Sequence, residues 1–510
     1  MNASLASTGS WSQTDSGRVS PVVWLYLISL VLPIQFSIGP LTLMPTRLLL
    51  LFVFVPLMAN LFSGKYGKIL WIDILFMLHM AWAAIAIGLN NPEQVIQYTG
   101  STNIEFLGGY MVARAYIRTQ AQFQKLIYGL LLLNVALLPF SLVELRTGTA
   151  IVPSLIAKVP GLRTVAQVTY EKRMGLERVQ NAFAHPIHYG LFCSMAFTLV
   201  LVGLKGYMSD TLRRLGTIAV FAGVFMGLSS GPLLATFLQI GLMAWAWTFR
   251  KIQRKWLLLL GLFAFMWVFI DLLSNRGPTK VIMSYATFDA QTAYYRAAIN
   301  DWGWMNVWDN PIFGLGLREW IRPAYMLTGS VDNFWLVMAM RYGLPGLVFV
   351  AVGYALGLWQ VGRRNFTGHP VLERLRFAWV VTFACLAFTL VTVHVWTAIY
   401  TFVFFAFGAG MWMITWQPDE SAGAEAAPAD RNPRRLTYSR SAPAPATAAS
   451  PVRGALPAAA ASLPTTLPAS LPAAGSPPPS APASAAKAQG DAPPERKQTA
   501  YTRFAPRTVP

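Results

Sequence analysis

Long apolar runs separated by short polar segments dominate the first 416 residues of the chain. Runs of roughly 17–25 residues, the length that a helix needs to cross a lipid bilayer, fall at about 22–38, 42–62, 69–88, 124–145, 181–203, 212–229, 232–249, 256–273, 332–360, 376–394 and 397–416. A shorter run, IEFLGGYMVARAYI from Ile104, is either a short span or a re-entrant piece. With this run included, the pattern predicts an all-α, polytopic membrane protein with about twelve transmembrane helices.

Basic residues cluster in alternate loops of this arrangement. On the side that holds the termini they are Arg18, Lys65, Lys68, Arg118, Lys125, Lys205, Arg213, Arg214, Arg250, Lys251, Arg254, Lys255, Arg363, Arg364, Arg374 and Arg376. Because Lys and Arg are enriched in cytoplasmic loops, we expect both termini in the cytoplasm. Without the segment 104–117 every later loop would be inverted, and RKIQRK at 250–255 would face outward.

The chain divides into three regions of different composition. Residues 1–21 form a short polar N-terminus, expected in the cytoplasm, and residues 22–416 form the membrane domain. Two outer loops of this domain are long, at about 146–180 and about 274–330, and long loops are usually functional. Residues 417–510 are rich in Ala, Pro and Ser with few large apolar side chains. Such a composition cannot bury a core, which predicts a disordered cytoplasmic tail.

Overall composition agrees with a membrane protein and narrows the possible partners. The chain is 55% hydrophobic and 12% charged, against roughly 25% charged residues in soluble domains. The net charge of +19 lies in clusters between apolar runs, so we expect contact with the lipid bilayer and no nucleic acid. The two cysteines, Cys193 and Cys385, lie inside apolar runs, which argues against a disulfide framework. His185 and His188 share a helix face but lack a neighbouring carboxylate pattern, so we expect no metal.

The second long outer loop, at 274–330, is dense in aromatic and charged side chains. It contains Tyr294, Tyr295, Trp302, Trp304, Trp308 and Trp320 beside Arg296, Arg318, Arg322, Asp301, Asp309 and Glu319. Aromatic faces beside carboxylates suit sugars, and planar guanidinium groups suit phosphate. The composition therefore indicates a phosphate-linked saccharide at a membrane surface. An interfacial aromatic belt with an amphipathic helix explains the same composition, and composition alone leaves both interpretations open.

The stretch SVDNFWLVMAMRYGLPG, residues 330–346, combines an apolar helix with ionisable groups. Asp332 and Asn333 lie at the N-terminal end of this expected helix, and Arg341 lies inside it. Ionisable groups in membrane segments usually serve pairing or function. Asp332 is either a helix cap or a reactive carboxylate, and the two roles are compatible. Arg341 comes nine positions later, so we expect it on the opposite face, snorkelling or in an intramembrane pair.

The order of motifs from Arg296 to Gly346 resembles the O-antigen ligase and polysaccharide polymerase superfamily of bacterial inner-membrane proteins. Arg296 is followed by NPIFGLG at 310–316, by the pair Asp332-Asn333, and by Gly343 and Gly346. Ligases carry histidine at the first position of the pair, with the same spacing to the first glycine. RVQNAFAHPIHYGLF (178–192) and LSSGPLLA (228–235) resemble two further family segments, so the resemblance covers about 178–360.

This resemblance implies a glycosyltransferase that moves a glycan from a polyprenyl-pyrophosphate carrier to an acceptor sugar hydroxyl, on the outer face of the bacterial inner membrane and without a cofactor. It implies Asp332 as the base and Arg296 as the main cation for pyrophosphate. Further candidates for substrate binding are Arg178, Arg318, Arg322, Asn333, Arg47, His185 and Trp308. Because Asp332 replaces the ligase histidine, we expect a polymerase or exopolysaccharide-type member rather than a ligase.

Two other functions fit the same span pattern. About a dozen spans with both termini inside is a common layout for a transporter or flippase of lipid-linked saccharides, although the two halves of the chain show no convincing similarity. A non-catalytic scaffold within a polysaccharide export or assembly complex would account for the tail better than for the aromatic loop.

Overall fold

The computed structural model describes residues 17–38, 41–169, 171–275, 277, 278, 281 and 290–418. The expected tail, apart from its first residues, and the first 16 residues lie outside this part of the chain. The described chain is mostly helical, and seven of its helices are long and apolar enough to cross a membrane. They are α2 (Pro45–Phe62), α3 (Trp71–Asn90), α6 (Gln120–Thr147), α8 (Pro186–Thr198) with its extension to Gly203, α11 (Lys255–Leu273), α14 (Phe334–Arg363), and α16 (Thr397–Gly408) with α17 (Trp412–Thr415).

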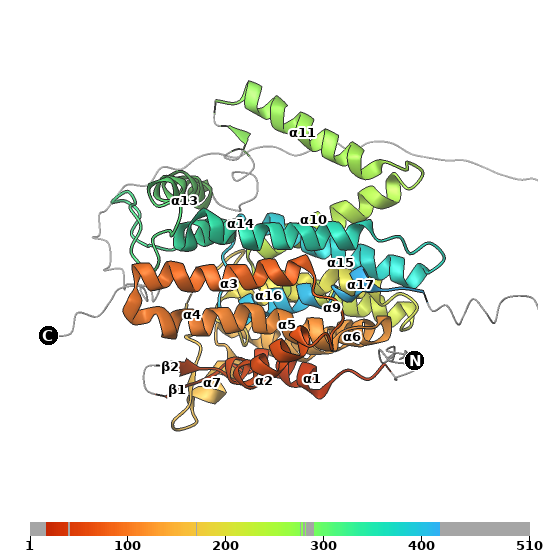
Figure 1. Cartoon of the computed structure of the whole chain (residues 1–510), viewed down its shortest axis with the longest axis horizontal. Helices are drawn as coiled ribbons and strands as arrows, with labels where there is room; N and C mark the ends of the chain where they lie inside the picture. The colour runs from red at the N-terminus through yellow and green to blue at the C-terminus, as the bar shows by residue number, and fades with distance from the viewer. Residues whose placement is uncertain are drawn as a thin grey trace, which may run out of the picture. The chain divides into compact units, whose positions relative to one another are not determined.

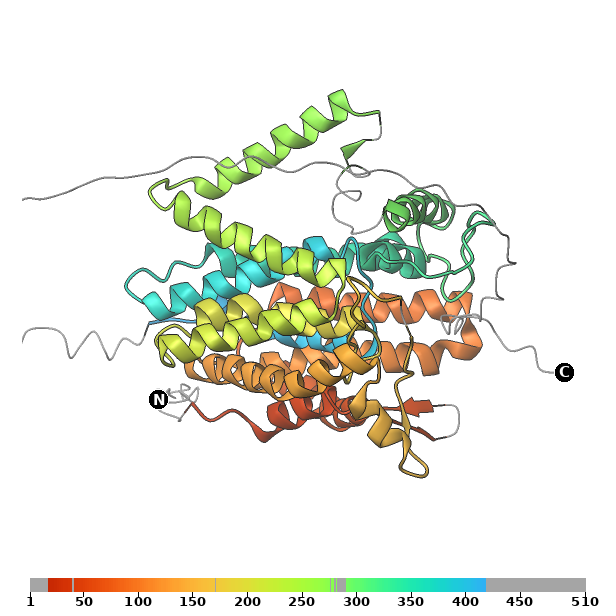
Figure 2. The same ribbon diagram turned by 180° about the vertical axis from the view of Figure 1, so that it is seen from behind.

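Further helices run beside these seven or cap their ends (Figures 1 and 2). They are α1 (Pro21–Leu30), α4 (Val95–Asn103), α5 (Gly109–Tyr116), α7 (Ile151–Ala157), α9 (Asp210–Met226), α10 (Ser230–Thr248), α13 (Ala290–Asp309) and α15 (Pro370–Thr389). α11 stands away from the other helices in both views, and none of its residues is buried. An apolar helix with no buried face presents its whole surface to lipid.

The short apolar run from Ile104 is the second half of a longer helix. α4 continues through a π-helical turn at Ile104–Gly108 into α5, so that the chain is helical from residue 95 to residue 116. At 1.5 Å per residue this run is roughly 33 Å long, which is enough to cross a bilayer. π-Turns within α-helices often occur at functional sites, and this one contains Glu105.

The first expected span, 22–38, is not one helix, and that prediction was wrong. α1 ends at Leu30, and after Pro33 the chain forms β1 (Ile34–Ile38). β1 pairs antiparallel with β2 (Leu41–Leu43) and β3 (Arg163–Thr164) in the order β2-β1-β3. Pro33 cannot continue a helix hydrogen-bond pattern, and the β-branched Ile34 and Ile38 favour a strand. A small sheet is therefore added to the expected all-α architecture.

The basic loops gather at one end of the helix bundle, which we call the basic face. There Arg118 Nη1 donates a hydrogen bond to the Lys65 carbonyl at 3.1 Å, and Arg374 Nη2 donates one to the Lys205 carbonyl at 3.2 Å. These contacts join loops that are far apart in sequence. They are the loops that the alternating pattern placed on one common side.

The other loops meet at the opposite end, which we call the loop face. It carries residues 31–38, 41–44, 90–94, 148–169, 171–185, 227–230, 290–333 and 390–396. Asn90 Nδ2 donates to the Phe313 carbonyl at 3.2 Å, and the Phe334 amide donates to the Leu390 carbonyl at 2.8 Å. Figure 1 shows α13, β1 and β2 at this same end of the bundle. The motifs singled out in the sequence therefore share one face.

α14 is broken at Gly343, where φ is 73° and ψ is 180°. A break in a helix frees backbone groups, and each such group left unpaired in lipid costs several kcal/mol. The NPIFGLG loop supplies the missing partners. Its hydrogen bonds run from the Leu315 amide to the Met340 carbonyl at 2.7 Å, from the Gly316 amide to the Arg341 carbonyl at 3.1 Å, and from the Leu344 amide to the Pro311 carbonyl at 2.7 Å.

The glycines of the motif permit this close approach of backbone to backbone. A Cβ atom on Gly343 would lie 2.0 Å from the Ile312 carbonyl oxygen, and one on Gly314 would lie 2.6 Å from the Gly343 amide nitrogen. Both glycines also have positive φ, which L residues with a Cβ adopt at a cost. Glycine is therefore required at positions 314 and 343, because a side chain at either position would clash with the backbone of the docked loop or of α14.

α3 supports the broken helix from the other side. His79 Nδ1 lies 2.7 Å from the Gly346 carbonyl, and Trp82 Nε1 donates to the Tyr342 carbonyl at 2.9 Å. The Trp82 ring also stacks on Phe313 with ring centroids 5.4 Å apart. One tryptophan thus contacts both the break and the loop docked on it. These contacts fix the outer part of α14, which begins directly after Asp332 and Asn333.

We predict that Gly343→Ala lowers the free energy of unfolding by roughly 3 kcal/mol or more, because the new methyl group meets backbone that cannot move away. Gly368→Ala is the matched control, since Gly368 also has positive φ (88°) but nothing within 4 Å of its Cβ position. That change should cost only about 1–2 kcal/mol. Thermal unfolding in detergent micelles compares the two variants, and equal losses would contradict the docking.

Candidate functional site

α13 and the loop after it form a small core against the outer part of α14. Trp320 is buried there with Ile299 and Val307, packed on Leu336 and Met340. Trp302 and Trp304 are partly buried against the same cluster. Most of the tryptophans that suggested sugar binding therefore serve packing. Trp308 and Tyr294 differ, because their side chains are exposed on α13.

Arg296 projects from α13 into a buried position, with only 7% of its surface exposed. Its Nε and Nη1 atoms are buried and have no hydrogen-bond partner among the described residues. Burial of an unsatisfied polar group costs free energy, all the more when the group is charged. Burial and the charge of Arg173 lower the pKa of Arg296, whereas Asp332 opposes the shift. A guanidinium group left this way is ready to bind an anion.

Asp332 lies close enough to Arg296 for each charge to shift the pKa of the other. The N-cap of α14 is Asn333, whose Oδ1 accepts a hydrogen bond from the Leu336 amide at 3.1 Å. The cap therefore does not use the Asp332 carboxylate. Burial raises the pKa of Asp332, and the positive charge of Arg296 partly offsets this rise. A carboxylate with a raised pKa suits proton transfer near neutral pH.

Two more arginines reach this region from the loop between α7 and α8. Arg178 Nη2 donates to Ser229 Oγ at 2.8 Å, and Arg173 Nη1 donates to the Leu228 carbonyl at 2.7 Å. The charge of Arg173 acts on both Arg296 and His185. Arg178, a sequence candidate, thus joins the predicted Ser-rich turn. Arg173 was missed, because one arginine in a long polar loop carries no signal of its own.

A buried carboxylate from α6 holds the backbone that follows Arg178. Glu144 accepts hydrogen bonds from the Gln180 amide at 2.8 Å and from the Asn181 amide at 2.9 Å. Asn181 Nδ2 then donates to Ser141 Oγ at 2.7 Å. Glu144, which is 2% exposed, therefore acts as a positioning residue for the arginine loop. It too was missed from the sequence, where it reads as one polar position in an apolar helix.

Backbone strain concentrates around these residues. Within the described part of the chain, positive φ values outside glycine occur at Met174 (55°), Asn181 (51°), Leu228 (41°) and Thr397 (50°). Met174 and Leu228 are direct neighbours of Arg173 and Ser229. Each left-handed residue costs roughly 1–2 kcal/mol. Such strain persists where the surrounding structure enforces it, and it clusters at functional sites.

His185 lies near Arg178 and Arg173, and His188 follows it within the first turn of α8. His185 Nδ1 accepts a hydrogen bond from the Ile187 amide at 3.0 Å and caps α8. Burial, His188 and the charges of Arg178 and Arg173 hold the pKa of His185 well below its usual range. The His188 ring lies 3.9 Å from the Trp396 ring. Among the residues that the structure describes, no group of three or more His, Cys, Asp or Glu could hold a metal ion.

Arg318 and Arg322 make contacts within the loop face. Arg318 Nη2 donates to Asn90 Oδ1 at 2.8 Å, which ties the loop to the end of α3. Arg322 pairs with Glu319, and its Nε donates to the Met326 carbonyl at 3.1 Å. Both contacts hold the loop that follows the NPIFGLG motif. A part in substrate binding for these two arginines stays a prediction.

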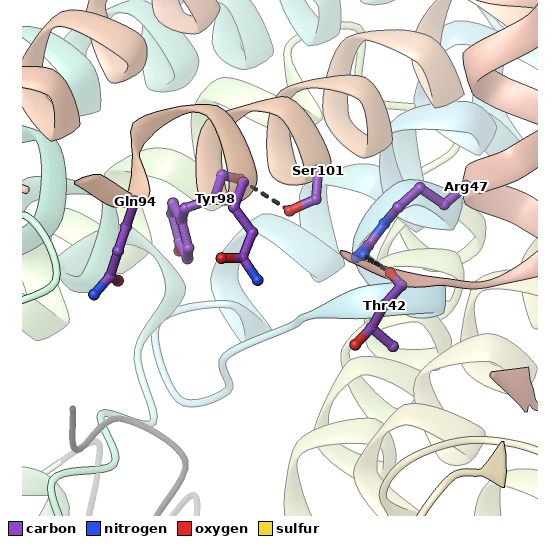
Figure 3. Close-up of a pocket in the computed structure, with 6 residues that line it drawn as sticks. Thr42, Arg47, Gln94, Tyr98 and Ser101 are labelled. Atoms are coloured by element: carbon purple, nitrogen blue, oxygen red, sulfur yellow. Dashed lines mark hydrogen bonds between the residues drawn. The ribbon is translucent and has the colours of Figure 1, made fainter. Parts of the chain in front are cut away.

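Arg47 lines a cavity near the loop face (Figure 3), and Arg341 contacts Tyr98, another residue of its lining. Arg47 Nη2 donates to Glu105 Oε1 at 2.7 Å across the π-turn. Arg341 donates to the Tyr98 hydroxyl group, and its guanidinium lies 5.3 Å from the Tyr98 ring centroid. The expected intramembrane pair for Arg341 is therefore present, with a tyrosine as the partner.

Together, the loop face presents several guanidinium groups near the partly buried carboxylate of Asp332. Arg173, Arg178 and Arg296 come from two segments that are distant in sequence, and Asp332 from a third. We call these four residues the arginine cluster. Guanidinium forks suit phosphate oxygens, and the carboxylate can accept a proton. The arrangement can therefore bind a phosphate group and deprotonate a hydroxyl group beside it.

Residues 215–351 match the model of the O-antigen ligase family. This match confirms the resemblance found in the sequence. It runs from α9 to the middle of α14 and includes Ser229, Arg296, the NPIFGLG loop, Asp332 and Gly343. Arg173 and Arg178 lie outside it. None of the curated proteins matches the chain. The chain is thus a membrane protein with an O-antigen ligase-family domain.

Proposed function

We propose that the chain is a membrane glycosyltransferase that transfers a glycan from a polyprenyl-pyrophosphate carrier to an acceptor sugar hydroxyl. The observation that carries this proposal is Arg296, whose buried Nε and Nη1 atoms have no hydrogen-bond partner within the described part of the chain and whose charge acts on Asp332. The family match supports a lipid-linked saccharide as the substrate class. A pyrophosphate beside Arg296 would supply hydrogen-bond acceptors for these two buried nitrogens.

Asp332 and the three arginines of the arginine cluster have different roles in the proposed reaction. Asp332 takes the proton from the acceptor hydroxyl as its oxygen forms a bond to the anomeric carbon of the donor. The bond between that carbon and the pyrophosphate oxygen breaks, and the electron pair leaves with the lipid pyrophosphate. Arg296, with Arg173 and Arg178, stabilises the negative charge that develops there. Asp332 then releases its proton to water.

The remaining candidates take supporting roles in this proposal. Trp308 offers an exposed ring on α13 on which a sugar can stack. Asn333 fixes the start of α14, and His185 caps α8 beside the arginines. Arg318 and Arg322 order the loop that follows the NPIFGLG motif. Because Asp332 replaces the ligase histidine, a polymerase that extends surface or exopolysaccharide is favoured over an O-antigen ligase.

We also propose about twelve membrane crossings, with the basic face in the cytoplasm. Beyond the seven long helices, the crossings are α1 with β1, the run from α4 to α5, α9, α10 and α15. The run from α4 to α5 leaves the loop face beside Asn90 and reaches the basic face, where Arg118 contacts Lys65. The chain then lies in a bacterial inner membrane, with both termini in the cytoplasm.

Cysteine labelling tests this orientation, because the native Cys193 and Cys385 are buried. A membrane-impermeant maleimide should label Thr328→Cys, on the loop face, in spheroplasts with an intact inner membrane. It should label Thr367→Cys, on the basic face, only after the membrane is opened. The reverse pattern would place the arginine cluster in the cytoplasm and overturn the proposed orientation.

The function is tested by incubating purified protein in lipid with a lipid-pyrophosphate-linked repeat unit and no other enzyme. Wild type should make longer glycans and release polyprenyl pyrophosphate. Asp332→Asn and Arg296→Gln should each lower the rate about a hundredfold or more. Asp309→Asn, an exposed acid on α13, and Arg146→Gln, an exposed arginine on the loop face, are matched controls that keep the rate.

Other outcomes of this assay discriminate between functions. A wild type that ignores the repeat unit but glycosylates a lipid A-core acceptor is a ligase. A wild type that transfers glycan to neither acceptor contradicts the transferase proposal and leaves transport of lipid-linked saccharides as the better explanation. Full activity of Asp332→Asn would remove Asp332 from the role of base.

The pH dependence of the transfer rate follows from the charge state of Asp332. Only the carboxylate form accepts a proton, so kcat/KM should fall as the pH drops through its pKa. Because burial raises this pKa, the fall should begin above the usual aspartate value of about 3.9. Arg296→Gln removes a charge that favours the carboxylate, so its residual activity should fall at a higher pH than that of wild type. A shift to lower pH would contradict the electrostatic interaction between Arg296 and Asp332.

A further inference from the structure

A cavity opens at the loop face between α2 and α4, and none of the residues assigned to the reaction lines it. Its volume is about 220 Å³. Six residues line it, all with polar side chains: Thr42, Arg47, Gln94, Gln97, Tyr98 and Ser101. Sites that enclose a drug-sized ligand measure roughly 300–1,000 Å³. The cavity therefore suits one small polar group rather than a lipid chain.

Four of the lining residues form one stripe along a helix. Gln94 immediately precedes α4, and Gln97, Tyr98 and Ser101 follow at the i+3, i+4 and i+7 positions, which share one helix face. Figure 3 shows Gln94, Tyr98 and Ser101 along this side of the helix, with Arg47 and Thr42 across the cavity. The stripe thus presents two amides, a hydroxyl group and an aromatic ring. Amides and hydroxyls both donate and accept hydrogen bonds, as the hydroxyl groups of a sugar require.

The positive charge in this cavity is neutralised by the protein itself. Arg47 Nε and Nη2 donate to Glu105 Oε1 at 3.1 and 2.7 Å, and Nη1 donates to the Thr42 carbonyl at 2.5 Å. All three guanidinium nitrogens of Arg47 are therefore engaged. Arg296 differs, since two of its nitrogens lack partners among the described residues. An anion should prefer the arginine cluster, and the cavity should prefer a neutral, hydroxyl-rich group.

A rigid element connects the cavity to Asp332. Tyr98, in the cavity wall, accepts a hydrogen bond from Arg341. The Arg341 carbonyl is held by the Gly316 amide of the docked loop at 3.1 Å. Arg341 comes seven residues after Phe334, the first residue of α14, a helical rise of roughly 10 Å, and Asp332 lies two residues before Phe334. A short oligosaccharide can bridge such a distance.

We propose that this cavity binds a neutral sugar ring of the acceptor glycan, at a distance from the hydroxyl group that reacts. This inference rests on the proposed glycosyl transfer. In it, Gln94, Gln97 and Ser101 bind sugar hydroxyls, the Tyr98 ring packs on the sugar, and Glu105 keeps Arg47 from attracting pyrophosphate. The broken helix α14 then sets the separation between the bound ring and Asp332. The cavity thereby selects the acceptor and orients it.

Direct binding measurements test this proposal without relying on transfer. Full-length protein in lipid nanodiscs is titrated with lipid-free oligosaccharides, prepared by partial acid hydrolysis of the surface polysaccharide of the host cell, and separately with inorganic pyrophosphate. Ser101→Trp, which fills the cavity, should weaken oligosaccharide binding at least tenfold. Gln94→Leu should weaken it several-fold, and both variants should bind pyrophosphate like wild type. Ile96→Trp is the matched control, because Ile96 lies on α4 outside the cavity with 85% of its surface exposed.

Arg296→Gln should show the opposite pattern, with weaker pyrophosphate binding and unchanged oligosaccharide binding. Pyrophosphate binding that is lost in Ser101→Trp would show an anion site in the cavity and overturn the proposal. The proposal also fails if wild type binds none of the oligosaccharides, or if Ser101→Trp binds them like wild type. Should wild type transfer glycans while Ser101→Trp binds normally, only the cavity assignment fails. Should wild type transfer nothing while the binding pattern holds, the transferase proposal fails and the cavity remains a saccharide site.

Discussion

The docking of the NPIFGLG loop onto the break in α14 determines the architecture of the loop face. A broken helix at membrane depth must have its free carbonyl and amide groups paired, and the loop supplies all three hydrogen bonds described at Gly343. The same contact fixes the outer part of α14 and the start of the polar loop around Trp320. It therefore positions Asp332, directly before α14, relative to Arg296, on α13. Loss of this contact would release both residues at once.

A second, independent set of contacts positions the other two arginines, Arg173 and Arg178. Glu144 and the strained turn at Asn181 hold the segment before α8, while Ser229 and the Leu228 carbonyl receive Arg178 and Arg173. Buried polar groups rarely go unpaired, and most of those around this segment are satisfied by the protein. Arg296 has two buried nitrogens without a hydrogen-bond partner among the described residues. Two such nitrogens on one guanidinium group favour a bound anion at that position.

The sequence allowed some of these features to be predicted and concealed others. The alternation of basic loops predicted which loops share a face, because topology follows local charge. The motif order from Arg296 to Gly343 identified Asp332, because it depends on short local motifs, but the break in α14 at Gly343 was not predicted, since the apolar run continues through it. Arg173, Glu144 and the pair Arg47–Glu105 could not be found this way, since their partners lie far away in sequence. The first span was misjudged because the hydrophobicity of Ile34 and Ile38 suits a strand as well as a helix. The polar stripe from Gln94 to Ser101 has helical spacing and could have been recognised.

Whether Arg296 and Asp332 form the two sides of one reaction centre is tested most directly by locating the bound carrier lipid. A cryo-electron microscopy structure of the full chain in nanodiscs with undecaprenyl pyrophosphate would show where the diphosphate binds. The diphosphate should lie within hydrogen-bond distance, about 3 Å, of Arg296 Nε and Nη1, on the side that faces Asp332. A diphosphate bound in the cavity at Arg47, with Arg296 still uncontacted, would contradict this assignment.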